Sequence, residues 1–101
     1  MRWTVFLQDQ TGHAIELPGL RSHIEFELDM RDENKATLRL LKYLDAYGAT
    51  IFNRLQMDDL IDDVRQLAEQ AKVDASSITQ LLELARRCQS DRHAYLHFYG
   101  E

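Results

Sequence analysis

The residues with the clearest chemical potential lie in one acidic run. The sequence Asp58-Asp59-Leu60-Ile61-Asp62-Asp63 contains a DDxxD string. On a helix, Asp58 and Asp62 lie one turn apart, as do Asp59 and Asp63, so each pair of carboxylates could share a hard cation such as Mg²⁺. The corresponding chemistry would be the binding of a metal-chelated diphosphate.

Three interpretations of this run stay open. The string is the magnesium and diphosphate motif of isoprenoid synthases, but those are much longer helical enzymes with a second acidic motif, and this chain has neither feature. The run could instead be a solvated acidic face, or a surface that docks a basic partner. We expect no metal and no cofactor, and we take Asp58, Asp59, Asp62 and Asp63 as candidate partner-binding residues.

A second candidate surface lies in the segment His93–Tyr99, which alternates in the manner of a strand. Ala94, Leu96 and Phe98 would share one face, and the histidines and tyrosines the other. His93 and His97 would lie roughly 13 Å apart on such a strand, too far to hold one zinc ion. Tyrosine is enriched at interfaces, so Tyr95, His97 and Tyr99 are candidate partner-binding residues. The alternative is a partly exposed sheet face, or one covered by a chain terminus.

The sequence offers little for covalent catalysis. A nucleophile needs a neighbouring base, and the candidates are Cys88 and the pair Ser22-His23. Cys88 falls on the apolar stripe of an expected helix, which suits a packed small side chain. The sequence has no GxGxxG, P-loop, HExxH or GxSxG pattern. We therefore expect no catalytic residues and a protein that is not an enzyme.

Composition limits the compartment and the partners. The 101 residues carry 17 acidic and 12 basic side chains, a net charge of -5, which is the wrong sign for nucleic-acid affinity. No apolar run approaches the length of a membrane span, and no secretory signal is recognisable. With a single cysteine, these features predict a cytoplasmic protein. We expect a basic or neutral protein partner, and no nucleic acid, membrane or small-molecule ligand.

The first part of the chain reads as three strands. Residues 3–7 and 14–17 would form a β-hairpin around the turn residues 9–12, and Pro18-Gly19 would end it. Residues 24–29 alternate strictly, so that Glu25, Glu27 and Asp29 would face water.

The second part reads as three helices and a last strand. A helix is expected over 33–47, with Asp32 as N-cap and Gly48 as its stop, followed by a connector at 50–52. Asn53 and Gln56 can form a capping box that starts a second helix, and Ser77 and Gln80 one that starts a third, ending near Gln89. The expected fold is a single α+β domain over 1–101 of order βββαααβ, with three helices on one face of a mostly antiparallel sheet.

Two segments, 47–56 and 93–101, resemble a group of small uncharacterised bacterial proteins. Small acidic bacterial proteins of this type include immunity proteins, which neutralise a cognate toxin inside the producing cell. The resemblance implies a protein-binding module, an immunity-type inhibitor that occludes a toxin's active site. The alternative is a structural or adaptor protein that self-associates through a sheet edge or an aromatic strand.

Overall fold

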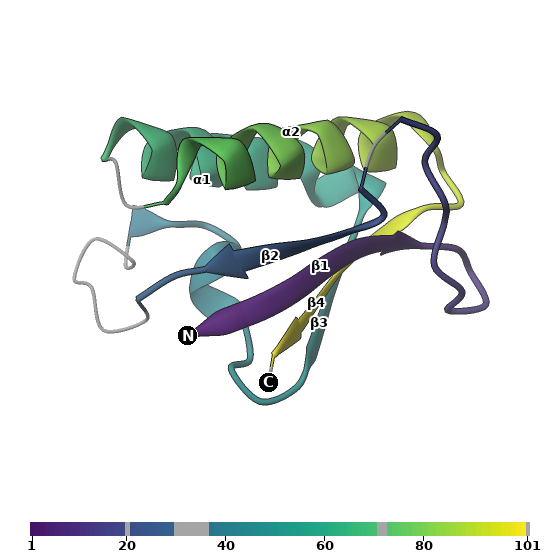
Figure 1. Cartoon of the computed structure of the whole chain (residues 1–101), viewed down its shortest axis with the longest axis horizontal. Helices are drawn as coiled ribbons and strands as arrows, with labels where there is room; N and C mark the ends of the chain where they lie inside the picture. Colours follow the sequence, from purple (N-terminus) through teal and green to yellow (C-terminus); the bar gives the residue numbers. More distant parts are fainter. Residues whose placement is uncertain (20, 30–36, 71–72, 101) are drawn as a thin grey trace.

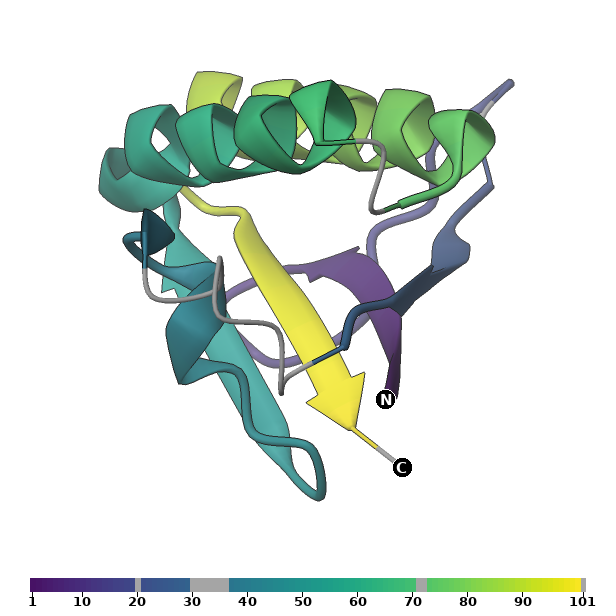
Figure 2. The ribbon, with the colours of Figure 1, turned by 90° about the vertical axis from the view of Figure 1, so that its left-hand side faces the viewer.

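The computed structural model describes residues 1–19, 21–29, 37–70 and 73–100. Four strands form one antiparallel sheet in the order β2-β1-β4-β3, and two helices cover one of its faces (Figures 1 and 2). The strands are β1 (Arg2–Gln8), β2 (His23–Glu27), β3 (Ala49–Asn53) and β4 (Tyr95–Gly100). The helices are α1 (Met57–Glu69) and α2 (Ala75–Ser90), with short 3₁₀ segments η2 (Leu41–Tyr43) and η3 (Arg54–Gln56). The predicted α+β class and antiparallel sheet are thus confirmed.

Alternation along the strands sends one set of side chains into the core. In β1 the inward set is Trp3, Val5 and Leu7, and the buried side chains of the other strands extend this apolar layer. Phe98 at the centre of β4 makes edge-to-face contacts with Phe26 and Phe52, with ring centroids 5.9 and 5.7 Å apart. Such geometry is favourable beyond simple burial. The core therefore lies between the sheet and the helices.

The predicted capping box of Asn53 and Gln56 forms at the start of η3, and α1 begins directly after η3. The Asn53 side chain accepts a hydrogen bond from the Leu55 amide at 2.9 Å, and Gln56 Oε1 accepts one from the Asn53 amide at 2.9 Å. Helix α2 differs from the prediction, because its N-cap is Asp74, whose carboxylate accepts from the Ser77 amide at 3.1 Å. The predicted end near Gln89 is within one residue of the observed one.

The predicted hairpin is wrong in its second strand. The turn itself forms: Asp9 Oδ1 accepts from the Thr11 and His13 amides at 2.9 and 3.1 Å, and Gly12 has a φ of 88°. Beyond it, the contact with β1 among the described residues is one isolated bridge between Ala14 and Gln8, with the Ile15 amide donating to the Leu7 carbonyl at 2.9 Å. β2 pairs with β1 instead, as the strict alternation in 24–28 allows.

The predicted helix over 33–47 is also wrong. Of its span, 33–36 and the proposed cap Asp32 lie outside the described residues, and 37–47 form η2 and turns. Leu38, Leu41 and Leu44 of this segment are buried, but the backbone is bent by hydrogen bonds to a distant aspartate described below. The predicted connector at 50–52 is strand β3, which pairs with β4. The chain accordingly has two α-helices among its described residues, not three.

The second face of the sheet is left open. In both ribbon views α1 and α2 lie above the sheet, and among the residues that the structure describes no helix lies against its lower side (Figures 1 and 2). The side chains of β2 show the result: Ile24 and Phe26 are buried, whereas His23, Glu25 and Glu27 are exposed. Within the described residues, no helix has the length and apolar character that crossing a membrane requires.

Candidate functional site

The structure disperses the acidic run of α1. Asp63 does not lie on an exposed face: it is 2% exposed, and its carboxylate accepts hydrogen bonds from three backbone amides. These are the amides of Arg39 and Leu40, both at 2.8 Å, and of Leu41 at 3.0 Å. The expectation that Asp63 is a solvated surface residue is therefore wrong. Its carboxylate fixes the segment that leads into η2.

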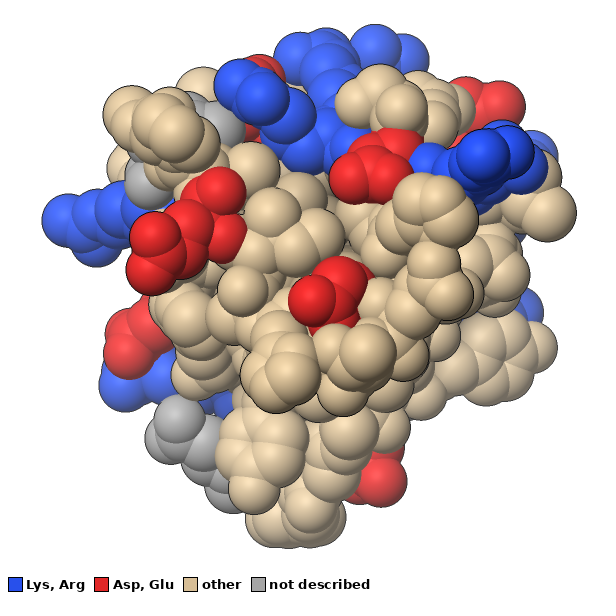
Figure 3. Space-filling view, turned by 90° about the vertical axis from the view of Figure 1, so that its right-hand side faces the viewer, with Lys and Arg blue, Asp and Glu red and all other residues tan. Residues whose placement is uncertain are grey.

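The other three aspartates of the run lie at the surface, and two have partners there. Asp59 Oδ1 lies 2.8 Å from Arg39 Nη1, and Asp58 accepts from Gln89 Nε2 at 2.6 Å. Asp62 is exposed. The pKa of Arg39 is raised mainly by its hydrogen bond to Asp59, and the charge of Asp62 also raises it. On the side shown in Figure 3, Lys and Arg side chains gather toward the top, over the helices, with Asp and Glu among them. The helix layer is thus not a uniform acidic surface.

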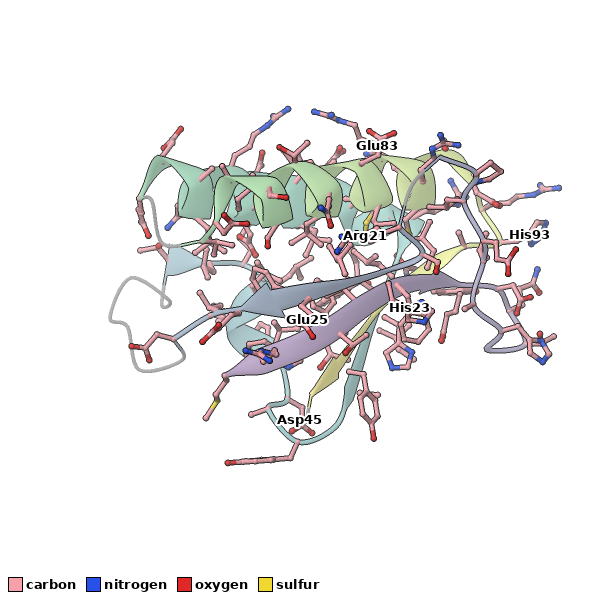
Figure 4. All side chains as sticks on the ribbon, in the orientation of Figure 1. Arg21, His23, Glu25, Asp45, Glu83 and His93 are labelled. Carbon is pink, nitrogen blue, oxygen red and sulfur yellow. The ribbon has the colours of Figure 1, made fainter. Side chains whose placement is uncertain are left out.

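No metal centre forms in the described part of the chain, where no group of three His, Cys, Asp or Glu side chains could hold an ion. His93 precedes β4, and its ring contacts the Gln10 side chain near the turn at Asp9. In Figure 4 it lies at the end of the molecule, away from His23 and Glu25 on β2.

The open face of the sheet carries a row of side chains that spans all four strands, with rings on three of them. His23 pairs with Phe6, Phe6 with His97, and His97 with Ile51. We call these four residues the central row. Ring centroids lie 4.8 Å apart for Phe6 and His23, and 4.6 Å apart for Phe6 and His97. The row is therefore already packed in the free protein.

His97 is the most constrained member of the central row. Its Nδ1 lies 2.8 Å from Oε1 of the nearly buried Gln8, so Nδ1–H donates to that amide oxygen. Its Nε2 is buried and has no hydrogen-bond partner among the described residues. Burial lowers the pKa of His97. The neutral ring is accordingly the form that fits the fold.

The lowered pKa of His97 makes the stability of the fold depend on pH. A histidine whose pKa is lower in the folded than in the unfolded chain stabilises the fold above its unfolded pKa, and this stabilisation is lost as the pH falls below about 6.5. We expect the free energy of unfolding to fall between about pH 7.5 and 5.5, and His97→Gln to flatten that slope. Denaturant unfolding across this range measures it, with the exposed His13→Gln as control. An unchanged slope in His97→Gln would contradict the assignment.

The other predicted residues of the aromatic strand flank this row. Tyr99 is 52% exposed and lies one step along β4, and its ring centroid is 6.3 Å from that of His97. Tyr95 is half-buried, pairs with Gln8 on β1 and with Asn53 on β3, and lies on the same face. The structure thus brings Tyr95, His97 and Tyr99 together, and separates them from the aspartates of α1.

The expected inert character of Cys88 agrees with its surroundings. The side chain is fully buried in the core, its Sγ lies 3.5 Å from the Ala94 carbonyl, and burial raises its pKa to about 11. Because the thiolate is the reactive form, we expect no reaction with a thiol reagent in the native protein and full reaction in denaturant. Titration with an aromatic disulfide reagent measures this, and rapid native labelling would contradict it.

Ser22 lies in contact with the exposed side chain of His23. Ser22 Oγ lies 3.1 Å from His23 Nδ1, and the His23 ring packs on Phe6. The adjoining hollow of about 490 Å³ lies between β2 and the start of α2, with His23 and Glu25 on one side and Asp74 and Ser77 on the other. Asp74 and Ser77 already bind each other as part of the helix cap.

Sequence reasoning missed three members of the central row. Phe6 and His23 were not assigned to a face, although Phe6 alternates with the buried Val5 and Leu7. Ile51 belongs to the segment 50–52 that was predicted as a connector, yet it is 48% exposed on the edge strand β3. Alternation in residues 3–8 would have found Phe6, whereas Ile51 depends on β3 being a strand.

No family model, curated protein or solved structure matches this chain.

Proposed function

We propose that the chain is a protein-binding module, an immunity-type inhibitor that occludes the active site of a cognate bacterial toxin with the open face of its sheet. The observation that carries the proposal is the central row, which places packed rings on a sheet face that no helix covers. Exposed or half-buried aromatic side chains that are already held in place lose little freedom on docking, and such residues dominate binding energy at interfaces. The proposal assigns the chain no catalytic step.

The charges beside the central row favour a basic or neutral partner. Glu25 and Glu27 are exposed on β2, and Arg2 is the cation next to them, with its Nη1 3.8 Å from Glu25 Oε2. Exposed charges at the rim of an interface mainly speed encounter and select partners. The rings would then supply affinity, while the glutamates would select against acidic proteins. The aspartates of α1 are a weaker candidate because Asp63 is buried and Asp58 and Asp59 have partners.

The test uses the product of the gene next to this chain's gene, because an immunity protein is normally encoded beside its toxin. We expect calorimetry to detect a complex, and Tyr99→Ala to weaken it by about 30-fold or more, as for an interface hot spot. The control is Tyr43→Ala, since Tyr43 is also exposed but lies in η2, off the sheet. Equal binding by both variants would contradict the sheet-face assignment. A loss confined to a combined Asp58→Asn, Asp59→Asn and Asp62→Asn variant would place the interface on α1 instead.

A further inference from the structure

The exposed apolar side chains of this chain gather around one edge of the sheet. Six large hydrophobic side chains are exposed among the described residues, and three of them lie in or beside the edge strand β3: Tyr47 at 82%, Ile51 at 48% and Leu55 at 77%. Tyr99 lies on β4 next to Ala49 of that strand. Apolar groups concentrated in this way mark an interaction surface.

The two edges of the sheet differ in charge. Edge strand β2 carries the exposed Glu25 and Glu27, the usual protection against strand-to-strand association. Edge strand β3 has the sequence Ala-Thr-Ile-Phe-Asn, with no charge and no proline. A strand without charge can meet an identical strand without repulsion, even in a chain of net charge -5. Two copies of the β3 edge can therefore pair without charge repulsion between the strands.

The backbone of β3 also has groups that point away from the sheet. The Gly100 amide donates to the Gly48 carbonyl at 2.8 Å, which sets the phase of the β3–β4 ladder. Because hydrogen-bonded and non-bonded pairs alternate in an antiparallel ladder, the N–H and C=O groups of Ala49 and Ile51 face the open edge. The Asn53 amide would face it too, and it is bound by the Gln56 side chain.

We infer that β3 is a self-association edge, at which a second copy of this chain pairs antiparallel about a two-fold axis through Ile51. The two Ile51 residues would exchange a pair of backbone hydrogen bonds, and Ala49 of each copy would lie opposite Asn53 of the other. Tyr47 and Leu55 flank the two ends of β3, Tyr47 in the preceding turn and Leu55 in η3, so the axis brings the end with Tyr47 of one copy toward the end with Leu55 of the other. These two are the most exposed large apolar side chains among the described residues, and the pairing would bring them to the same interface.

The resulting dimer joins two four-stranded sheets into one of eight strands. Each copy's open face stays on the same side, so the central rows of both copies would form one continuous surface with Ile51 at its middle. The inference is independent of the proposed function, because a toxin inhibitor could act as a monomer or as a dimer. Its test therefore measures association of the chain alone.

Sedimentation over a range of concentrations tests the edge. We expect the mass of the wild-type chain to rise with concentration from 11.8 kDa toward twice that value. Ile51→Lys, which places two like charges at the axis, is expected to stay monomeric. His23→Lys is the matched control, since His23 is the exposed member of the same row on the opposite edge, and it should dimerise as the wild type does. A wild-type monomer at all concentrations, or an undiminished Ile51→Lys dimer, would overturn the inference.

Cysteine crosslinking tests the register. In the proposed pairing the two Ile51 Cα atoms lie about 5.5 Å apart, within disulfide range, whereas those of the two Ala49 residues lie roughly 14 Å apart. Mild oxidation should therefore crosslink Ile51→Cys and leave Ala49→Cys uncrosslinked. Both variants keep the buried Cys88, and oxidation of the wild-type chain measures the background crosslinking through that cysteine. Crosslinking of Ala49→Cys alone would show that the two-fold axis lies elsewhere.

Discussion

Replacing Asp63 with alanine is expected to lower the free energy of unfolding by about 3 kcal/mol or more, since it leaves three buried or part-buried amides without their acceptor. Each amide that loses its partner inside the protein costs about 1–3 kcal/mol, and the missing side chain also leaves a void. Chemical denaturation measures the loss.

Two further variants separate this role from a general effect of charge. Asp62→Ala, the exposed neighbour on the same helix, should change stability by no more than about 0.5 kcal/mol. Asp63→Asn keeps the size of the side chain but turns an NH₂ group toward an amide that needs an acceptor, and it should be nearly as damaging as alanine. Equal, small effects of Asp62→Ala and Asp63→Ala would contradict the buried anchor.

Gly100→Ala is expected to destabilise the protein by about 3 kcal/mol, because a Cβ atom at this position would meet the backbone of Asp45 and Ala46, in the segment that precedes β3. It would lie 2.4 Å from the Ala46 carbonyl oxygen and 2.5 Å from that of Asp45. The Asp45 carbonyl is itself held by a 2.8 Å hydrogen bond from the Trp3 indole. Relief of the clash therefore requires backbone movement, which is the costly form of overpacking.

The matched control is Gly48→Ala, at the other end of the hydrogen bond from the Gly100 amide. There the closest atom is the Asp45 side-chain oxygen at 2.7 Å, which can rotate away. We expect a loss of about 1 kcal/mol, at the ordinary level of point mutations. Thermal or denaturant unfolding of both variants makes the comparison, and the reverse ranking would show that the contact at Gly100 is not tight.

The parts of the fold that the sequence predicted correctly are those with local signals. Strict alternation in residues 24–29 identified β2, and the box of Asn53 and Gln56 identified the start of the helical segment made of η3 and α1. Both patterns are set by neighbours a few residues away. The same is true of the aromatic alternation that placed Tyr95, His97 and Tyr99 on one face.

The errors fall where distant residues decide the structure. The leucines of 38–44 have helical spacing, but Asp63, more than 20 residues later, binds the amides of 39–41 and gives a turn. β3 is too short to show a period, and it is a strand because β4 pairs with it from more than 40 residues away. The same long-range pairing exposes Ile51 and completes the central row, so that row could not be assembled from the sequence.

The central claim is that the open sheet face neutralises a toxin, and a growth assay tests it most directly. Cells that express the product of the gene next to this chain's gene would also express the wild-type chain, the open-face variant Phe6→Ala with Tyr99→Ala, or the off-sheet variant Tyr43→Ala. The account predicts growth with the wild type and Tyr43→Ala, and death with the open-face variant, provided that circular dichroism shows all three to be folded. Death with the wild-type chain, or full protection by the folded open-face variant, would contradict it.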